Sequence, residues 1–402
     1  MDNGHRNYFI SIVSGSYPYG TAATIRNITF LKGLKELNYN ISLFVLYPDK
    51  NQDPNSNKLN GEYNQIPFYY TTNNLKYQKN KIKQYLTLLL SVLHCNKMIR
   101  KRYNKRNTII LNQISNPFIS FILTILLKKK CKLYLHEVTE FPFVRKHGGS
   151  LAKYIYNKLI VPKFDKVFVI SSALKTYFNK IITPQKVEIL NMFVDLNRFR
   201  ISHDPVYQFD YIAYCGTMNT DKDGVPILIE AFHFVKRHYP NLKLVLIGDN
   251  KSRPVHKDIL RKIEKYQLQD SIIFSGHINA KHIPRYLIGA KILALARPDN
   301  IQAKGGFPTK LGEYLATGKP VVVTKVGDIP NFIQDGINGY LSEPNSKEFA
   351  NKIIDVLRNY NMAVKIGEAG KKLAEKEFNY QIEAAKVANY IEADIRDYYN
   401  EH

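Results

Sequence analysis

Short apolar runs alternate with segments of helical periodicity along this chain, and the alternation occurs in both halves. The runs lie at residues 8–14, 41–47, 108–113, 131–138, 166–171 and 187–190, and again at 211–216, 242–248, 271–276, 291–296 and 320–324. Strands that alternate with helices form parallel sheets, and strands that are apolar throughout belong to a sheet covered on both faces. The sequence therefore predicts an α/β protein with two doubly wound domains.

Domain boundaries follow from the interruption of this pattern. The chain has 402 residues, enough for two or three domains at about 150 residues each. Residues 195–210 have no clean period and are predicted to be a linker, so the domains should span 1–200 and 208–380. Doubly wound domains bind ligands at the carboxyl ends of their strands, so we expect the site in a cleft between the two domains.

The net charge of +24 is concentrated in the first half of the chain. Residues 1–200 hold 31 Lys and Arg against 10 Asp and Glu, whereas the remainder holds 27 against 24. No acidic residue lies between Glu62 and Glu137. Such a surface attracts polyanions, either nucleic acid or an anionic membrane. Residues 81–99 add an apolar stretch between basic ends, which suits a lipid interface as well as a core helix.

Cysteine usage and the apolar runs indicate the compartment. Cys95, Cys131 and Cys215 are widely spaced, which argues against a disulfide scaffold and fits a reducing compartment. The N-terminus lacks the basic-then-apolar order of a signal peptide. The best apolar run, 118–127, is about half of the roughly 20 residues that a spanning helix needs. We expect a cytosolic protein that is not integral to a membrane.

Two loops of the first half hold candidate polar residues. The loop 14–24 contains Gly20 and leads into a helix, which suits a phosphate or a sugar hydroxyl but is also common in ordinary turns. His136 and Glu137 lie at the end of a predicted strand. A histidine there can perform acid–base chemistry or can pack as a structural residue.

Two loops of the second half hold stronger candidates. Lys222 precedes a helix, where a lysine can pair with a diphosphate or lie in solvent. In the segment 296–341, glycines at 305 and 306 lead into a helix with Lys310 and Glu313. Glycines let backbone amides approach a ligand, and a helix N-terminus favours phosphate. Glu313, about one turn into the helix, is placed to accept hydrogen bonds from a ribose diol.

These motifs resemble the retaining glycosyltransferases of family 4. GFPTKLGEYLATGKPVVVTKVGDIPNFIQDGINGYL is similar to the nucleotide-sugar signature of that family, and GTMNTDKDGVPILIEAF to its lysine–glycine loop. VEILNMFVDLNRF is similar to its interdomain connection, and YPYGTAATIRNITFLKGLKELNYNISLF to its N-terminal loop and first helix. The resemblance spans about residues 8–385 and is strongest in the second half.

The resemblance implies the GT-B fold, in which two Rossmann-like domains face a central cleft. Residues 1–200 would then form the acceptor-binding domain and 208–380 the nucleotide-sugar-binding domain. The C-terminal helix, about 380–402, would pack back on the first domain.

The resemblance also implies roles for single residues. Lys222 would contact the donor diphosphate, Glu313 would hold the ribose hydroxyls, and His136 would lie near the transferred sugar, so these three are the expected catalytic residues. The backbone at 277–278 would face the base. The expected donor site consists of Gly20, Gly216, Lys222, His277, Ile278, Gly306, Phe307, Pro308, Thr309, Lys310, Leu311 and Glu313.

Two positions depart from the family pattern. The family commonly has a glutamate where this chain has Gly305, and an arginine where it has Thr217. Lys222 and Lys310 are then left to neutralise the diphosphate. No Asp-x-Asp pair lies in a suitable loop, so we expect lysines and a helix dipole, rather than a metal or another cofactor, to stabilise the leaving group.

The expected function is therefore a retaining, metal-independent glycosyltransferase. It would move a sugar from a nucleoside-diphosphate sugar, with UDP as the expected nucleotide, to a glycan or lipid-linked acceptor of bacterial capsule or O-antigen. The basic N-terminal domain would dock on the inner face of the cell membrane. Two alternatives stay open: a non-catalytic homologue or partner subunit that binds sugar nucleotides, and a nucleic-acid-binding protein, for which the sequence offers charge but no recognised motif.

Overall fold

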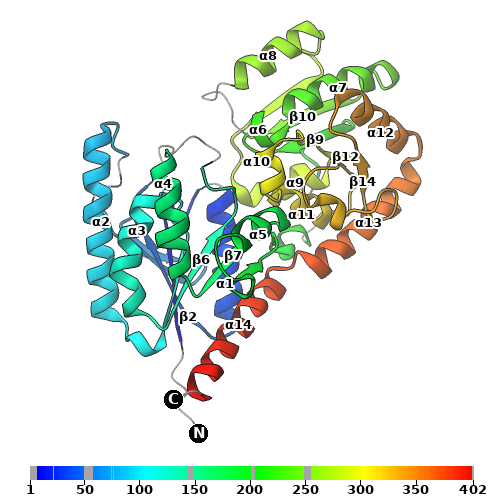
Figure 1. Ribbon diagram of the computed structural model, residues 1–402. Coiled ribbons are helices and arrows are strands. Elements are labelled where there is room, and N and C mark those ends of the chain that lie inside the picture. The colour runs from blue at the N-terminus through cyan, green and yellow to red at the C-terminus, as the bar shows by residue number, and fades with distance from the viewer. Residues whose placement is uncertain are drawn as a thin grey trace. The chain divides into compact units, whose positions relative to one another are not determined.

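The structure divides into two compact units, each built on a parallel sheet. It is a computed structural model, and it describes residues 7–20, 22–48, 58–73, 75, 77–143, 149–200, 204–218, 220–248 and 255–400 (Figure 1). Unit 1 comprises Met1–Phe193 and Tyr380–His402, and unit 2 comprises Val194–Asn379. The first division therefore falls before the boundary at residue 200 that the sequence indicates, and the last helix belongs with the first unit.

The sheet of unit 1 has eight strands in the order β3-β4-β2-β1-β5-β6-β7-β8, and among them β3 alone is antiparallel to its neighbour. The strands are β1 (Tyr8–Val13), β2 (Asn40–Val45), β3 (Asn60–Tyr63), β4 (Ile66–Tyr70), β5 (Thr108–Asn112), β6 (Leu133–Val138), β7 (Lys166–Val169) and β8 (Val187–Ile189). The α-helices are α1 (Ala22–Glu36), α2 (Lys81–Arg102), α3 (Pro117–Leu127), α4 (Ser150–Tyr154), α5 (Ser172–Asn179) and α14 (Tyr380–Asn400). A π-helical turn, η3 (Ile155–Ile160), continues α4. Short 3₁₀ turns are η1 (Lys105–Asn107), η2 (Lys128–Lys130), η4 (Val161–Lys163) and η5 (Pro184–Lys186).

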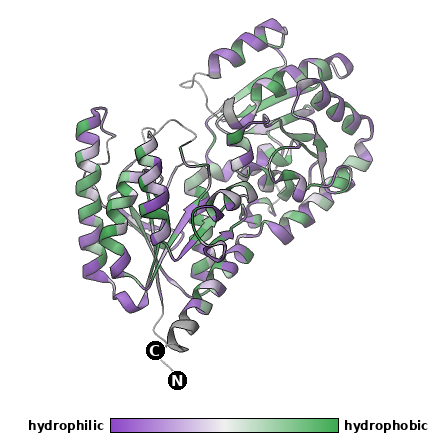
Figure 2. Ribbon diagram, viewed as in Figure 1, coloured by the Kyte–Doolittle hydropathy of each residue, from purple (hydrophilic) through white to green (hydrophobic). Residues whose placement is uncertain are grey.

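Helices cover both faces of this sheet. Side chains alternate between the faces of a strand, and one face packs into a core with α1 and α14, as Phe9, Leu31 and Ile391 illustrate. On the other face, Tyr134 of β6 lies beside Thr124 of α3. Figure 2 shows polar and apolar residues alternating along the helices, as expected for helices with one face on a sheet. The continuous apolar strands of the sequence thus form a sheet buried on both sides.

Unit 2 holds a six-stranded parallel sheet in the order β11-β10-β9-β12-β13-β14. The strands are β9 (Tyr211–Cys215), β10 (Lys243–Ile247), β11 (Ile272–Gly276), β12 (Ile292–Leu295), β13 (Val321–Thr324) and β14 (Tyr340–Ser342). The helices are α6 (Thr220–Asp223), α7 (Val225–His238), α8 (Val255–Lys265), α9 (Ile283–Ile288), α10 (Ile301–Gly305), α11 (Thr309–Ala316), α12 (Ser346–Arg358) and α13 (Tyr360–Glu377). The 3₁₀ turns are η6 (Leu196–Phe199), η7 (Ala280–His282) and η8 (Ile329–Asn331). The order of the strands reverses at β9, which has β10 on one side and β12 on the other.

The predicted fold class, α/β with two doubly wound sheets, is confirmed. Each apolar run that the sequence indicates becomes a strand. Three features differ from the expectation. The hairpin β3–β4 and the edge strand β14 were not expected, and the segment 195–210 is not a plain linker, because it contains η6 with buried Leu196 and Phe199.

Candidate functional site

At the carboxyl end of β9, the side chain of Lys310 packs against Gly216. Gly216 follows β9 directly and has φ +156°. A Cβ built at Gly216 would lie 2.3 Å from Cε of Lys310 and 2.6 Å from the hydroxyl oxygen of Tyr214. Glycine at this position therefore lets the Lys310 side chain lie across the end of the strand. This is the reversal point of the sheet, where doubly wound folds bind ligands.

Lys310 forms an ion pair with Asp223 at this point. The Asp223 side chain is 1% exposed and that of Lys310 is 18% exposed. Asp223 ends α6, so the half-buried Lys222 lies beside it in the chain. The structure thus brings the predicted Gly216 and Lys310 together, and it places Lys222 on the neighbouring turn.

Arg297 is a buried cation that the sequence analysis missed. It follows β12, is 3% exposed, and donates from Nη2 to the carbonyl oxygens of Ala303 (2.8 Å) and Gly306 (3.3 Å). Burial lowers its pKa to about 10, while the charge of Asp223 acts in the opposite direction. Its position after the apolar run 291–296 was the available signal. Arg297 fixes the backbone that leads into α11.

The side chains of the glycine-rich turn before α11 pack into unit 2. Phe307 packs with its ring centroid 5.3 Å from that of Phe332 and 5.7 Å from that of Phe378. Pro308 and Leu311 are also buried. The contribution of these predicted donor residues to a ligand would therefore come from main-chain groups at the start of α11, where Thr309 and Lys310 are half-buried.

Glu313 is held by an arginine from a distant part of the sequence. Nη1 of Arg198, on η6, lies 2.6 Å from Oε1 of Glu313, and both side chains are 22% exposed. Nη2 of Arg198 donates to the carbonyl oxygen of Ala280 at 3.0 Å. Nothing in the local sequence around residue 198 signals this pairing, because the two charges are far apart in the chain.

Cys215, the last residue of β9, has Glu313, Lys310 and Arg198 as charged neighbours. Burial, and after it the nearby carboxylate of Glu313, raises the pKa of its thiol to about 12. The cations Lys310 and Arg198 act on the same thiol in the opposite direction. The backbone N–H of Cys215 donates to the hydroxyl of Tyr314 at 2.6 Å. The predicted ammonium group of Lys310 thus lies at the end of β9, and the predicted carboxylate of Glu313 is on the same helix, α11.

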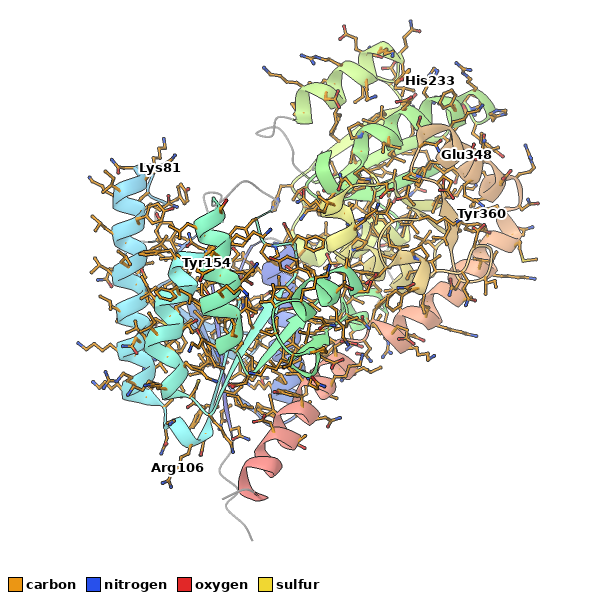
Figure 3. All side chains as sticks on the ribbon, in the orientation of Figure 1. Lys81, Arg106, Tyr154, His233, Glu348 and Tyr360 are labelled. Carbon is orange, nitrogen blue, oxygen red and sulfur yellow. The ribbon has the colours of Figure 1, made fainter. Side chains whose placement is uncertain are left out.

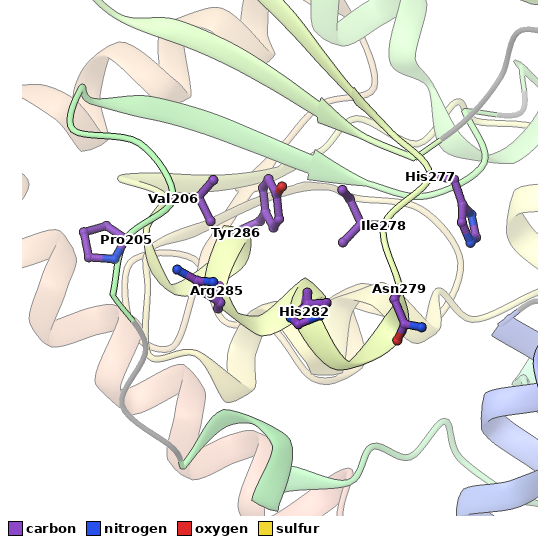
Figure 4. Close-up of a pocket in the computed structure, with 8 residues that line it drawn as sticks. All are labelled: Pro205, Val206, His277, Ile278, Asn279, His282, Arg285 and Tyr286. Carbon is purple, nitrogen blue, oxygen red and sulfur yellow. The ribbon is translucent and has the colours of Figure 1, made fainter.

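A pocket of about 390 Å³ lies elsewhere in unit 2 (Figure 4). It is lined by Pro205, Val206, His277, Ile278, Asn279, His282, Arg285 and Tyr286. The predicted base-facing residues His277 and Ile278 thus lie on its wall, in the loop between β11 and η7. Ala280, which accepts from Arg198, follows directly in this loop.

In unit 1, close packing before α1 leaves no room for a side chain at Gly20. A Cβ at Gly20 would lie 2.2 Å from Oγ1 of Thr24 and 2.4 Å from the carbonyl oxygen of Ser16. The Thr24 hydroxyl donates to that carbonyl at 3.0 Å. A glycine is required here for the loop geometry, and its predicted role toward a donor stays a prediction.

His136 is enclosed in the core of unit 1. Its Nδ1 lies 2.6 Å from the carbonyl oxygen of Asn112 and its Nε2 lies 2.8 Å from the hydroxyl of Tyr156. The ring stacks on Phe164 with centroids 4.4 Å apart. Burial lowers the pKa of His136 to about 4. Both ring nitrogens are engaged within the unit, which favours the structural one of the two roles open to this residue.

Glu137, beside it, belongs to a buried ion pair. Nη2 of Arg26 lies 2.8 Å from Oε1 of Glu137, and both side chains are almost fully buried. The Arg26 guanidinium also lies 4.0 Å from the ring centroid of Phe193 and donates to the carbonyl oxygen of Asn191. Gln113 donates to the other carboxylate oxygen. Sequence reasoning noted Glu137 but missed its partner Arg26 on α1.

Within the part of the chain that the structure describes, no group of three or more His, Cys, Asp and Glu side chains is arranged to hold a metal ion. Across the same residues, no helix is both long enough and apolar enough to cross a bilayer.

Comparison with known proteins adds a family match. The family model of glycosyl transferases group 1 matches residues 200–373, which lie within unit 2. A lipopolysaccharide 1,2-N-acetylglucosaminetransferase of Salmonella typhimurium is 25% identical over 305 residues, covering 69% of this chain and 73% of that protein. The chain spans 60%, 69% and 51% of the lengths of three further curated relatives.

Solved structures share the fold. Sucrose-phosphate synthase from Thermosynechococcus elongatus has a TM-score of 0.77 and 17% identity, over 98% of this chain and 100% of that one. The Anabaena protein HepE, solved in complex with UDP and glucose, has a TM-score of 0.74 and 17% identity, over 96% of this chain and 100% of that one. The likeness to these structures is one of fold, and the fold is GT-B.

Proposed function

Because residues 200–373 belong to the glycosyl transferases of group 1, we propose that this protein transfers a sugar from a nucleoside-diphosphate sugar to a glycan or lipid-linked acceptor. The observation that carries the proposal is the position of Lys310 across Gly216 at the end of β9, with Glu313 three residues further along the same helix, α11. An ammonium and a carboxylate there match the two polar parts of a nucleoside diphosphate, its phosphates and its ribose hydroxyls.

The chemistry of the leaving group explains the cations. Breaking the bond between the sugar and the diphosphate leaves negative charge on the nucleotide. Lys222, Lys310 and the N-terminus of α11 would stabilise that charge as preorganised electrostatics. Asp223 holds the Lys310 ammonium beside Gly216 before any ligand arrives. We propose that transfer proceeds with retention, without a metal ion, and with UDP as the leaving nucleotide.

Capsule or O-antigen synthesis is the proposed setting. The Salmonella relative carries lipopolysaccharide in its name, which supports a bacterial surface glycan as the acceptor class here. HepE was solved with UDP and glucose, which supports UDP as the nucleotide.

The helices on one side of unit 1 supply a surface for docking to a membrane. On α2, the side chains of Ile82, Leu86, Leu90 and Leu93 follow helical spacing and are all exposed. The neighbouring α3 and α4–η3 expose further large apolar side chains, namely Phe118, Ile125, Leu151, Tyr154 and Leu159. Lysines and arginines occupy both ends of α2, and Figure 3 shows Lys81 at its start. We call these exposed residues of α2, α3 and α4–η3 the apolar face.

An apolar face with basic ends fits the surface of an anionic bilayer. Apolar side chains enter the acyl boundary, and each nearby Lys or Arg adds about 1 kcal/mol on an anionic leaflet. We propose that unit 1 docks there, at the cytoplasmic leaflet, where lipid-linked acceptors are presented.

Co-sedimentation with vesicles tests the docking. We expect binding to vesicles with anionic lipid and loss of binding in Leu90→Asp. Ile337→Asp is the matched control, because Ile337 of unit 2 is 60% exposed against 66% for Leu90. Equal binding by both variants, or no binding by the unmodified protein at low salt, would overturn the docking proposal.

A ligand screen followed by an activity assay tests the transfer. We expect a thermal shift with one nucleoside diphosphate without added metal, and loss of that shift in Glu313→Ala. A ligand at about 100 times its Kd stabilises by about 2.7 kcal/mol, which is readily measured. Turnover of the matching sugar nucleotide then separates an enzyme from a non-catalytic homologue. Gly305 favours the non-catalytic alternative, because the family commonly has glutamate at this position. Absence of any shift would exclude the assignment of Lys222 and Glu313.

A further inference from the structure

Arg198 connects two parts of the proposed donor site that lie on different elements. Its Nη1 contacts Oε1 of Glu313 on α11, and its Nη2 donates to the carbonyl of Ala280 at the start of η7. The loop before Ala280 carries His277 and Ile278, the residues expected to face the base. One guanidinium therefore bridges the carboxylate proposed for the ribose and the loop proposed for the base.

The backbone around Arg198 is itself well anchored. Asp195 caps η6 by accepting from the backbone N–H of Asn197 at 3.2 Å. Leu196 and Phe199, on either side, are buried. The side chain of Arg198 thus extends from a turn that is fixed at both ends, which reduces the conformational freedom lost on making its two contacts.

The pair has a geometry suited to orienting a ligand group. A partly exposed ion pair adds little to stability, and these side chains are 22% exposed. The arginine occupies one carboxylate oxygen, Oε1, and a carboxylate has two. The second oxygen is then left for a ribose diol, and the contact at Oε1 restricts the rotation of the carboxylate.

From these contacts we propose that Arg198 is a positioning residue, which holds Glu313 and the loop 277–280 in the arrangement that receives the nucleoside of the donor. The inference rests on the proposed function for the identity of the ligand. The inference goes beyond the proposed function because it assigns a role to Arg198, which would act through Glu313 and the loop rather than on the reacting atoms. The opposite role, a side chain that occupies the nucleoside site and must leave, predicts tighter binding when Arg198 is removed.

Calorimetric titration of the full chain separates these roles. The ligands are UDP, 2′-deoxy-UDP and inorganic pyrophosphate, and the variants are Arg198→Ala, Arg198→Lys, Glu313→Ala and the double variant Arg198→Ala/Glu313→Ala. A charged hydrogen bond contributes about 1.5–3 kcal/mol, so we expect Arg198→Ala to weaken UDP binding about ten- to hundred-fold. In Arg198→Ala, the affinity for pyrophosphate should stay unchanged, and the affinity for 2′-deoxy-UDP should fall less than the affinity for UDP. Arg198→Lys should bind UDP more tightly than Arg198→Ala does.

Coupling between the two residues is the decisive readout. In the Glu313→Ala background, Arg198→Ala should weaken UDP binding much less than it does in the unmodified protein, because the two residues act as a unit. Lys262→Ala is the matched control, since Lys262 pairs with Glu230 at 3.1 Å with similar exposure on α8 and α7. Tighter UDP binding in Arg198→Ala, or equal losses for UDP and pyrophosphate, would overturn the proposal.

Hydrogen exchange in the absence of ligand makes the test independent of the nucleotide. Arg198→Ala should speed exchange of the amides at 278–283, and Lys262→Ala should not. If the unmodified protein binds no nucleoside diphosphate, the proposed function fails, whereas the exchange result still decides whether Arg198 holds the loop. Unchanged exchange at 278–283 would contradict that holding role.

Discussion

At the scale of single residues, two glycines of unit 2 have similar positive φ angles but differ in their surroundings. Gly224, before α7, has φ +64°, and Gly276, the last residue of β11, has φ +70°. A Cβ at Gly224 would lie 1.6 Å from the carbonyl oxygen of Ala296, whereas a Cβ at Gly276 would meet nothing within 4 Å. Gly224 is thus required by a close approach of two backbone segments beside Asp223.

We expect Gly224→Ala to destabilise the protein by at least about 3 kcal/mol, and Gly276→Ala by only about 1 kcal/mol, the strain of the left-handed conformation alone. Denaturant unfolding measures both. Equal losses in the two variants would show that backbone strain, rather than the contact with Ala296, decides the requirement for glycine.

His136 gives the free energy of unfolding a dependence on pH. Burial lowers its pKa from 6.5 to about 4, so between these values the unfolded chain binds a proton that the folded chain does not. Stability should therefore fall as the pH drops through 6.5 and should level off below about 4, a loss of about 3 kcal/mol.

Unfolding curves from pH 4 to 8 test this dependence. His136→Phe should lose the step that belongs to this group, and His238→Gln, at an exposed position on α7, should keep it. A step of unchanged size in His136→Phe would mean that another group titrates in this window.

At the scale of elements, α14 closes the core of unit 1 against α1. Gly33 of α1 lies against α14, and a Cβ there would be 2.7 Å from Cβ of Ala384. Ala384 and Ile391 are fully buried. The final helix of the chain is therefore part of the first core.

We expect Gly33→Ala to destabilise unit 1, although alanine favours a helix over glycine by about 1 kcal/mol. The added methyl group collides with Ala384, so packing decides the sign. Ala384→Gly in the same chain should restore part of the loss, and thermal unfolding of the single and double variants measures it. A more stable Gly33→Ala variant would show that moving the helices apart costs less than the helix propensity of alanine contributes.

The elements that the sequence predicts are those whose signal is local. The buried strands are continuous apolar runs, so their positions follow directly from the sequence. The hairpin β3–β4 was missed because its turn uses Asn64 and Gln65, both with positive φ, rather than the usual Asn-Gly pair.

The site shows the same division between local and distant signals. Lys310 and Glu313 follow from one helix and its glycine-rich turn. Their partners Asp223 and Arg198 come from other parts of the chain. A single sequence holds no record of which charges meet in space, and for that reason the pairing of Arg26 with Glu137 was missed as well.

At the scale of the whole molecule, the basic charge and the proposed donor site belong to different units. The excess of basic residues lies in the first 200 residues, whereas Lys222, Lys310 and Glu313 belong to unit 2. Binding of a nucleotide and binding of an anionic surface are therefore expected to have separate footprints.

Hydrogen exchange can map these footprints. We expect a saturating nucleoside diphosphate to protect peptides at the ends of β9 and β12 and at the start of α11. Anionic vesicles should instead protect α2 and α3. Protection of α2 by the nucleotide alone, at levels equal to those at β9, would contradict the separation.

The path of the chain between the units has a consequence for biosynthesis. The backbone N–H of Val194 donates to the carbonyl oxygen of Phe378 at 2.8 Å, so the segments that enter and leave unit 2 lie side by side. Unit 2 is thus inserted in the sequence of unit 1, and the ribosome must complete it before α14 emerges. The part of the protein that is synthesised first is the last to acquire its full core. Ribosome-bound chains in which residue 379 is followed by a linker long enough to fill the exit tunnel should therefore resist protease in unit 2 while unit 1 is still cleaved.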